Sequence, residues 1–346
     1  MSELMSALRI EQPGKTALVD IPVPHPARGE VLLRIDRVGY CGSDLSTFRG
    51  GNPLVSYPRI PGHELAGVVI DVADGVPATI ARGTAATVIP YTACGTCASC
   101  RRGRTNACER NQTLGVQRDG GMTAYLAVPW QKLRFAPLSQ RELALVEPLS
   151  VGFHAVARGR VTAGDTVLVF GCGMIGLGAI AAAGLEIGAR VIALDVAAAK
   201  LPLAQSAGAR HTIDASRENV AARVRELTDG HGPDVVIEAV GAAATYRQAV
   251  ELGAFTGRVV YIGYGKEPVA YETRLFVQKE LDILGSRNAT DADFDAVIAM
   301  LKRGTYPTAA TITRTVSLSE AGAALADWSA NPGAVTKIHV ALNGIA

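Results

Sequence analysis

The sequence predicts an α/β protein of two domains, one built mostly of β-strands and one built on a doubly wound parallel sheet. The chain has 346 residues, which exceeds one ordinary hydrophobic core and suits two domains of about 150 residues each. Up to residue 150, short β-like runs are separated by Pro and Gly. From Asp165 onward, strand-like and helix-like segments alternate, which is the pattern of a parallel sheet covered by helices.

The first of these regions contains four short apolar runs bounded by turn residues, which is typical of strands in a compact β domain. We expect these strands at residues 31–38, 66–72, 86–89 and 123–128.

The second region predicts six strands with helices between them, the arrangement of a dinucleotide-binding sheet. The strands are expected at residues 166–170, 190–194, 211–213, 234–238, 258–262 and 281–284. The helices are expected at 175–187, 197–207, 220–227 and 243–252.

After Gly285 the pattern changes again. We expect a helix at 291–302, a strand at 311–316, a helix at 318–328 and a strand at 336–342. Ser317 and Glu320 have the spacing of a capping box, which predicts where the second helix begins. This tail is expected to return to the first domain, so that residues 1–150 and 287–346 form one domain and 151–286 the other.

The composition bounds the class of function. Hydrophobic residues make up 48% and charged residues 19% of the chain, which is typical of a globular protein. The net charge is only +2 with both signs interspersed, so neither a nucleic acid nor an anionic membrane is expected as a partner. No run reaches the roughly 18 apolar residues of a membrane span, and the first residues do not resemble a secretory signal. We therefore expect a cytoplasmic protein.

A glycine-rich turn follows the first strand of the second region. The expected contacts to a dinucleotide are Gly171, Gly173, Met174, Ile175 and Gly176. A lone GxGxxG is a weak signal, but here a strand precedes it and a helix follows it. The glycines allow the backbone to approach a pyrophosphate, and the helix begins with unpaired N–H groups.

Asp195 ends the next strand, nineteen residues after Gly176. A carboxylate at this position binds the ribose hydroxyls and repels a 2′-phosphate, which favours NAD over NADP. Lys200 either reaches the ribose or is solvated. The alternative is a domain of this type that binds no nucleotide.

Four cysteines, Cys94, Cys97, Cys100 and Cys108, lie within fifteen residues. Four thiolates at such a spacing in one loop can surround a tetrahedral ion, and a closed Cys₄ site is structural. The alternative of four unliganded thiols is disfavoured because exposed thiols are readily oxidised. The loop therefore predicts a structural zinc ion.

A second set of metal-binding residue types is dispersed along the chain. Cys41, His63 and Glu147 together offer three protein ligands and leave a fourth position open, as a catalytic zinc requires. Taken singly, each has an ordinary explanation, because a lone Cys is usually a small core residue and a lone His is often only hydrogen-bonded.

On these motifs the chain resembles the zinc-containing medium-chain alcohol dehydrogenases along essentially its whole length. The family's signature stands here as Gly62-His63-Glu64 with Gly67, while Ala73 replaces a glycine that is usual in the family. Glu147 in place of a cysteine ligand is similar to the branch of sorbitol, L-threonine and L-galactonate dehydrogenases. The resemblance implies a GroES-like catalytic domain and a Rossmann domain, with reversible hydride transfer between an alcohol and NAD.

The resemblance also implies roles for individual residues. Zinc would be held by Cys41, His63 and Glu147, with Glu64 close enough to exchange in. Asp44 would orient His63, although it could instead stabilise a turn. Ser43 would pass the substrate proton outward. Many relatives continue this relay with a histidine, but Ser46 stands at that position, so water or Glu64 would have to take over.

Two arginines are candidates for substrate binding. Arg287 lies where the sorbitol branch places a substrate-contacting arginine, and Arg118 follows the cysteine loop. Arginine binds carboxylates in a bidentate way, which favours a sugar acid such as an aldonate over a neutral polyol. The alternative for both residues is surface charge.

Other readings stay open. A zinc-free quinone or enoyl reductase has the same fold but lacks both sets of metal ligands, and a protein on this scaffold need not be catalytic. Relatives are commonly dimers or tetramers joined through the last strand of the nucleotide domain, here about residues 281–284. We therefore expect a homo-oligomer.

Overall fold

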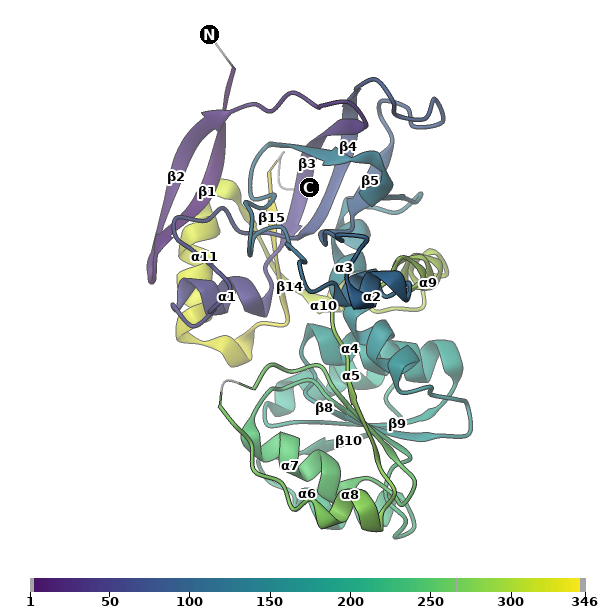
Figure 1. Cartoon of the computed structure of the whole chain (residues 1–346). Coiled ribbons are helices and arrows are strands. Elements are labelled where there is room, and N and C mark those ends of the chain that lie inside the picture. The colour runs from purple at the N-terminus through teal and green to yellow at the C-terminus, as the bar shows by residue number, and fades with distance from the viewer. Residues whose placement is uncertain (1–2, 266, 343–346) are drawn as a thin grey trace. The chain divides into compact units, whose positions relative to one another are not determined.

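The computed structural model describes residues 3–265 and 267–342. Its contacts divide the chain into two units, Met1–Glu147 with Thr308–Ala346, and Pro148–Pro307 (Figure 1). The expected division had placed residues 287–307 in the first unit, whereas the structure groups them with the second. The hydrogen bond between His154 Nδ1 and Asp293 Oδ2, at 2.9 Å, is one contact that holds this segment there.

The first unit contains a seven-stranded sheet in which β3 is central, because it pairs with three other strands. The strands that this sheet takes from before residue 150 agree with the four expected, with one addition, β7. They are β3 (Glu30–Gly39), β4 (Glu64–Val72), β5 (Ala85–Val88), β6 (Tyr125–Pro129) and β7 (Leu133–Phe135). Apolar side chains of β3, among them Leu33 and Ile35, are fully buried in the core of this unit.

The C-terminal segment completes this sheet. Strand β15 (Lys337–Ala341) lies antiparallel to β3, with His339 opposite Gly39, and β14 (Ile312–Ser317) pairs with β15. Helix α11 (Leu318–Ala330) begins with the predicted capping box, since the Ser317 hydroxyl and backbone N–H both donate to Glu320. The last strand is thereby placed next to the end of β3 that leads to Cys41.

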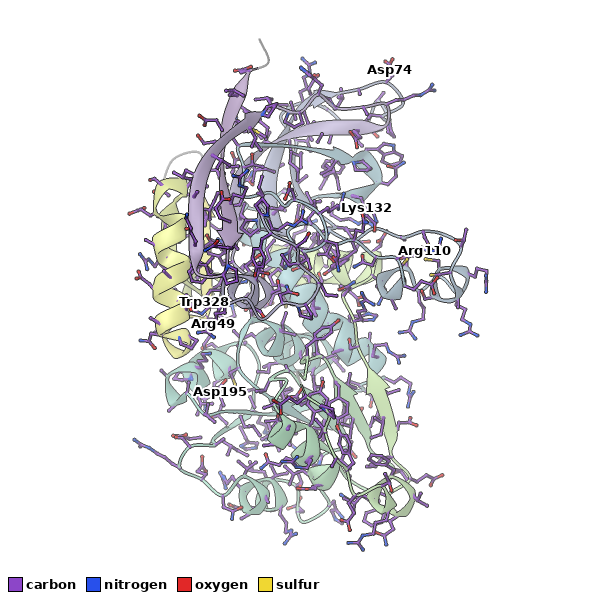
Figure 2. All side chains as sticks on the ribbon, turned by 60° about the vertical axis from the view of Figure 1, so that its left-hand side comes forward. Arg49, Asp74, Arg110, Lys132, Asp195 and Trp328 are labelled. Atoms are coloured by element: carbon purple, nitrogen blue, oxygen red, sulfur yellow. The ribbon has the colours of Figure 1, made fainter. Side chains whose placement is uncertain are left out.

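Several elements of the first unit escaped the sequence analysis. They are the hairpin β1 (Leu4–Gln12) and β2 (Lys15–Pro22), the helices α1 (Gly42–Phe48), α2 (Ala98–Arg101) and α10 (Thr308–Thr311), and the long helix α3 (Gln140–Arg158), which runs into the second unit. Pro148 lies inside α3, and an internal proline ordinarily ends or kinks a helix, so the length of α3 could not be predicted. Arg49, which follows α1, donates to Ser329 of α11 beside Trp328 (Figure 2).

The second unit contains a six-stranded, entirely parallel sheet in the order β10-β9-β8-β11-β12-β13. The strands are β8 (Thr166–Phe170), β9 (Arg190–Asp195), β10 (His211–Asp214), β11 (Val235–Glu238), β12 (Arg258–Tyr261) and β13 (Asp282–Gly285). In chain order this is the 3-2-1-4-5-6 arrangement of dinucleotide-binding domains. The predicted fold class is thus confirmed.

Four helices of this unit lie between strands where they were expected. They are α4 (Met174–Ala181), α5 (Leu201–Ser206), α6 (Val220–Leu227) and α7 (Ala243–Leu252). Helix α8 (Arg274–Gln278), between β12 and β13, was not predicted, and α9 (Asp291–Lys302) follows β13 at the expected residues. Helix α4 continues into a π-helical segment, Ala182–Ile187. Among the described helices of the chain, none combines the length and apolar character needed to cross a lipid bilayer.

A buried histidine on β15 predicts acid sensitivity of the first unit. Burial, followed by the charges of Lys337 and Arg37, lowers the pKa of His339 to about 3. The unfolded chain takes up this proton near pH 6.5, so the stabilisation is present above that pH and is lost as the pH falls towards 3. We expect a loss on the order of 5 kcal/mol across this window. His339→Leu should flatten that part of the curve of unfolding free energy against pH, and an unchanged curve would contradict this expectation.

Candidate active site

The pairing of β3 with β4 brings the dispersed metal-binding residues together. Gly39 lies opposite Glu64 in this pair, Cys41 follows β3, and His63 precedes β4. The Cys41 thiol, a ring nitrogen of His63 and a carboxylate oxygen of Glu64 lie within 4.8 Å of one another. The register of these two strands therefore brings Cys41 to His63 and Glu64, although it precedes them by more than twenty residues.

Asp44 joins the two loops that carry Cys41 and His63. Its carboxylate accepts the backbone N–H of Cys41 at 2.9 Å and that of Gly62 at 3.4 Å. No hydrogen bond to the His63 ring is formed, since His63 Nδ1 is buried without a partner among the described residues. Asp44 thus holds the backbone on both sides of the site, and its charge acts on the nearby His63 ring, while its role in orienting the imidazole stays a prediction.

The electrostatic environment of His63 is dominated by acidic neighbours. Burial alone would lower the pKa of His63, but the nearby Cys41 and Asp44 outweigh burial and raise it well above its ordinary value. The acidic groups around this buried imidazole make the binding of a positive ion at this position electrostatically favourable.

Glu147 lies on α3 and accepts a hydrogen bond from the Tyr91 hydroxyl. Burial raises the pKa of Glu147, and burial together with Glu147 raises that of Tyr91. Glu147 does not join the compact group of Cys41, His63 and Glu64. Tyr91 was not predicted to belong to the site, and its signal in the sequence is its position shortly before the cysteine loop.

Glu64 has a partner that the sequence analysis also missed. Its carboxylate forms a buried ion pair with Lys337 of β15, with Lys337 Nζ 2.6 Å from Glu64 Oε1. The signal in the sequence is a lysine at the start of a strand that is otherwise apolar except for His339. Both partners are nearly inaccessible to water, so this pair is part of the site's framework.

The donor set fits a catalytic zinc ion. It combines a thiol, an imidazole and carboxylates, which are the ligand types that zinc takes from proteins. Ser43 Oγ is also buried and lacks a hydrogen-bond partner among the described residues, as does His63 Nδ1. Buried polar atoms are normally satisfied, so these orphans fit a site that is completed by a ligand.

The four loop cysteines form a second group. The sulfur atoms of Cys94, Cys97, Cys100 and Cys108 lie within 4.8 Å of one another. Hydrogen bonds from the Ser99 hydroxyl and from backbone N–H groups lower the pKa of Cys97 to about 5, which favours the thiolate that binds metal. This cluster is compatible with a structural zinc. In Figure 2 the loop that carries Arg110 projects away from the rest of its unit.

Cys97→Ser is expected to reduce the zinc content by one ion per chain and to lower the thermal stability, because three thiolates no longer close a tetrahedral site. The measurement is zinc content by atomic emission together with the melting temperature. Arg102→Ala, which changes an exposed side chain of the same loop, is the control. A Cys97→Ser chain with the wild-type zinc content would contradict the assignment.

The glycine-rich turn follows β8 as predicted. Gly171 has a φ of +91°, a conformation that favours glycine. Gly173 is the N-cap residue of α4, and a Cβ added to it would meet no atom within 4 Å. A Cβ on Gly176 would lie 1.8 Å from the Gly171 carbonyl oxygen, so only glycine fits there. Met174 and Ile175 begin α4. The turn is thus tight and exposes its backbone at Gly173.

Asp195 ends β9, as the sequence predicted (Figure 2). Its carboxylate accepts the N–H groups of Cys172 and Ala197, both at 2.8 Å. Lys200 lies at the end of the following helical turn, close enough to influence Cys172 electrostatically. Cys172 itself is buried, and burial raises its pKa to about 12, so it is not an activated thiol.

The two arginine candidates have different surroundings. Arg118 is half-buried, and its Nη2 donates to the Pro90 carbonyl at 3.4 Å, so it is not a solvated surface charge. Arg287 lies after β13 in the second unit and is also half-buried.

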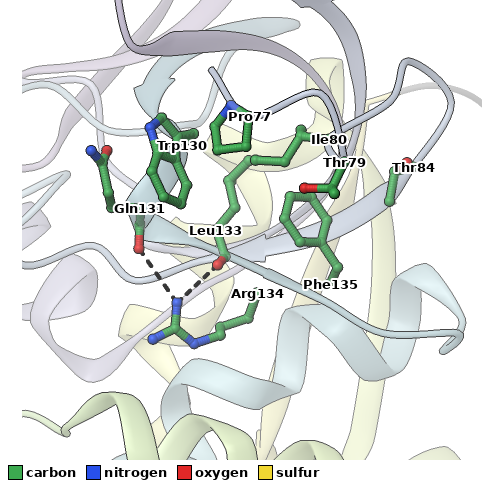
Figure 3. Close-up of a pocket in the computed structure, with 9 residues that line it drawn as sticks. All are labelled: Pro77, Thr79, Ile80, Thr84, Trp130, Gln131, Leu133, Arg134 and Phe135. Atoms are coloured by element: carbon green, nitrogen blue, oxygen red, sulfur yellow. Dashed lines mark hydrogen bonds between the residues drawn. The ribbon is translucent and has the colours of Figure 1, made fainter. Parts of the chain in front are cut away.

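A separate pocket on the first unit is lined by neither Arg118 nor Arg287, nor by any of the metal-ligand candidates (Figure 3). It is lined by Pro77, Thr79, Ile80, Thr84, Trp130, Gln131, Leu133, Arg134 and Phe135.

Curated relatives match nearly the whole chain. A zinc-type alcohol dehydrogenase-like protein of Haemophilus influenzae is 34% identical over 98% of this chain and 99% of its own length. The L-galactonate-5-dehydrogenase of Escherichia coli is 35% identical, covering 87% and 88%. A sorbitol dehydrogenase of Halalkalibacterium halodurans is 30% identical, covering 89% and 90%.

Solved structures share the fold and bind nicotinamide cofactors. An Escherichia coli alcohol dehydrogenase in complex with NADH has a TM-score of 0.91 at 29% identity, covering 99% of this chain and 100% of that one. A zinc-binding dehydrogenase of Sinorhizobium meliloti bound to NADP has a TM-score of 0.90 at 31% identity, with the same coverage.

Family models match both units. Residues 27–138 match the alcohol dehydrogenase GroES-like domain, and residues 175–303 match the zinc-binding dehydrogenase domain. The resemblance inferred from the metal and nucleotide motifs is confirmed. The chain belongs to the zinc-binding alcohol dehydrogenase family, among its polyol and sugar-acid dehydrogenases.

Proposed function

We propose that this protein oxidises a secondary alcohol of a sugar acid, an aldonate such as L-galactonate, to the ketone, with NAD as the hydride acceptor. The observation that carries the proposal is the group of half-buried Cys41 with buried His63 and Glu64, and with Glu147 beside it. A dinucleotide turn on the second unit supplies the other half of the reaction.

The metal ligands are assigned from this group. Cys41, His63 and Glu147 would hold the catalytic zinc, with Glu64 nearby, and the four loop cysteines would hold the structural one. When bound, zinc supplies a Lewis acid for the substrate oxygen. Ser43, whose buried hydroxyl has no partner among the described residues, would accept the proton of the substrate alcohol. From Ser43 the proton would leave through water, since Ser46 replaces the relay histidine.

The choice of NAD rests on Asp195. A carboxylate at the end of β9 repels a 2′-phosphate, while the Gly173 backbone is open to the pyrophosphate. Lys200 would then bind the ribose. Rates compared with NAD and NADP at equal concentration test this choice, and a faster reaction with NADP would contradict it.

The preference for an acid rests on Arg118 and Arg287. Arg118 Nε is buried without a partner among the described residues, so one donor remains for a substrate. Similarity to L-galactonate-5-dehydrogenase supports an aldonate, whereas similarity to sorbitol dehydrogenase supports a neutral polyol as the second candidate, with L-threonine as another substrate of this branch.

A panel of aldonates, polyols and L-threonine, followed by NADH absorbance, tests the substrate class. We expect an aldonate to give the highest kcat/KM, and Arg287→Ala to raise its KM about 10-fold or more. A neutral polyol as the best substrate would replace the proposal by its alternative, with Arg287→Ala then having little effect.

We also propose a homo-oligomer, a dimer or a tetramer. Strand β13 is the edge of its sheet, and Ile283 on it and the nearby Val277 of α8 are exposed by 42% and 83%. An exposed apolar edge strand favours pairing with a second copy. Light scattering on the purified protein would measure the mass, and a monomer at micromolar concentration would contradict this.

A further inference from the structure

Glu238 is a buried carboxylate of the second unit that the proposed hydride transfer does not use. It is the last residue of β11, and its side chain is fully buried. Its Oε2 atom has no hydrogen-bond partner among the described residues. A buried carboxylate oxygen without a donor is unfavourable for folding, so the stability of the sheet does not explain why a glutamate stands here.

Glu238 lies at the place in the sheet where dinucleotides bind. Strands β8 and β11 are neighbours, and the chain order of the strands reverses between them. Open parallel sheets bind their ligands at such a reversal, beyond the carboxyl ends of the strands. Glu238 pairs with Phe170, the residue directly before the glycine-rich turn. Its carboxylate is therefore at the edge of the sheet that carries the proposed cofactor site.

The other oxygen of this carboxylate, Oε1, fixes the turn that follows β11. It accepts the backbone N–H of Val240 at 3.0 Å and that of Gly241 at 2.8 Å. It also accepts the Thr245 hydroxyl at 2.7 Å, which ties the turn to the beginning of α7. Hydrogen bonds to an ionised acceptor are strong, and a negative charge is favourable beside a helix N-terminus. The turn is thereby held in one conformation.

The turn that Glu238 holds packs directly against the glycine-rich turn. A Cβ on Gly171 would lie 2.9 Å from Val240 Cγ2, so the Val240 side chain lies against this glycine. The turn after β12 is equally close, because a Cβ on Gly263 would lie 2.3 Å from the Gly241 nitrogen. Val240 is apolar and yet 52% exposed, which leaves it accessible to a ligand. The position of this exposed side chain therefore depends on the carboxylate.

We propose that Glu238 is a positioning residue for the dinucleotide. It holds residues 239–241 so that Val240 contacts the cofactor that lies along the glycine-rich turn. The carboxylate acts through this turn, since it is itself buried. The inference rests on the proposed NAD site and deepens it, because the affinity then depends on a carboxylate inside the unit as well as on the glycines and Asp195.

The test is the Kd for NADH, measured by the fluorescence of the bound cofactor in the zinc-loaded full chain. Glu238→Ala removes the acceptor of all three hydrogen bonds and should raise this Kd about tenfold. Glu238→Gln keeps an acceptor oxygen, so its Kd should stay within about threefold of the wild-type value.

Asp234→Ala is the matched control. Asp234 lies at the opposite end of the same strand, where its carboxylate accepts the Thr166 N–H at 2.7 Å. The melting temperature of this variant should fall, because a backbone donor loses its partner, but its Kd for NADH should stay at the wild-type value. The comparison separates positioning of the cofactor from a general loss of stability.

The inference is overturned if Glu238→Ala binds NADH as tightly as the wild type, or if Asp234→Ala weakens binding as much as Glu238→Ala does. If Glu238→Ala does not fold, amide hydrogen exchange of the wild type takes its place. The amides of residues 239–241 should then exchange more slowly once NADH is bound, and an unchanged rate would overturn the inference. A wild-type chain that binds neither NADH nor NADPH would instead overturn the proposed function.

Discussion

Cys41→Ser is expected to lower kcat/KM by a factor of about 10³ or more and to reduce the zinc content from two ions per chain to one. The thiolate is the only sulfur ligand that the catalytic group offers, and losing it leaves the catalytic metal weakly held. Asp44, which accepts the Cys41 backbone N–H, should still keep the loop in place. Parallel zinc and NADH measurements on the purified variant check this expectation.

Cys172→Ala is the matched control, because Cys172 is the one other cysteine outside the structural cluster. It should keep both zinc ions. If Cys41→Ser retained two zinc ions and wild-type turnover, the assignment of Cys41 as a ligand would be wrong.

Gly176→Ala is expected to abolish measurable NADH binding and to lower the stability of the second unit. The added Cβ would lie 1.8 Å from the Gly171 carbonyl oxygen, so either the turn or α4 must shift. Overpacking of this kind typically costs about 1–3 kcal/mol, and the displaced turn can no longer approach the pyrophosphate. Fluorescence titration with NADH and thermal unfolding measure the two effects.

Gly173→Ala separates cofactor binding from folding. A Cβ on Gly173 meets nothing within 4 Å, so the melting temperature should stay near that of the wild type. It would point into the space that the turn leaves for the cofactor, so the Kd for NADH should still rise, by about tenfold. Unchanged NADH binding in both variants would exclude this turn as the cofactor site.

The nucleotide unit could be predicted almost completely from the sequence. Its strands are short apolar runs at regular intervals, and the turn between β8 and α4 requires glycine at position 176 for steric reasons. Asp195 was found because its position at the end of β9 depends only on local spacing. Features of this kind depend on residues that are close together in the chain, so they can be predicted from the sequence.

The partners of the two catalytic carboxylates could not be predicted. Lys337 meets Glu64 across 273 residues, and Tyr91 meets Glu147 across 56. These contacts depend on the register of β15 against β3 and on the course of α3, which no local pattern encodes. Helix α3 was missed for the same reason, since Pro148 interrupts its helical pattern while tertiary packing maintains it.

Zinc at Cys41 and His63 is proposed to support NAD-linked alcohol oxidation. The most direct test follows the zinc content and the activity of the same sample while a chelator removes the metal. We expect NADH formation from the best substrate of the panel to fall in proportion to the loss of one zinc ion, while the second ion stays with the cysteine loop. Activity should return when zinc is added back. Full activity in a chain that has lost both zinc ions would contradict the account.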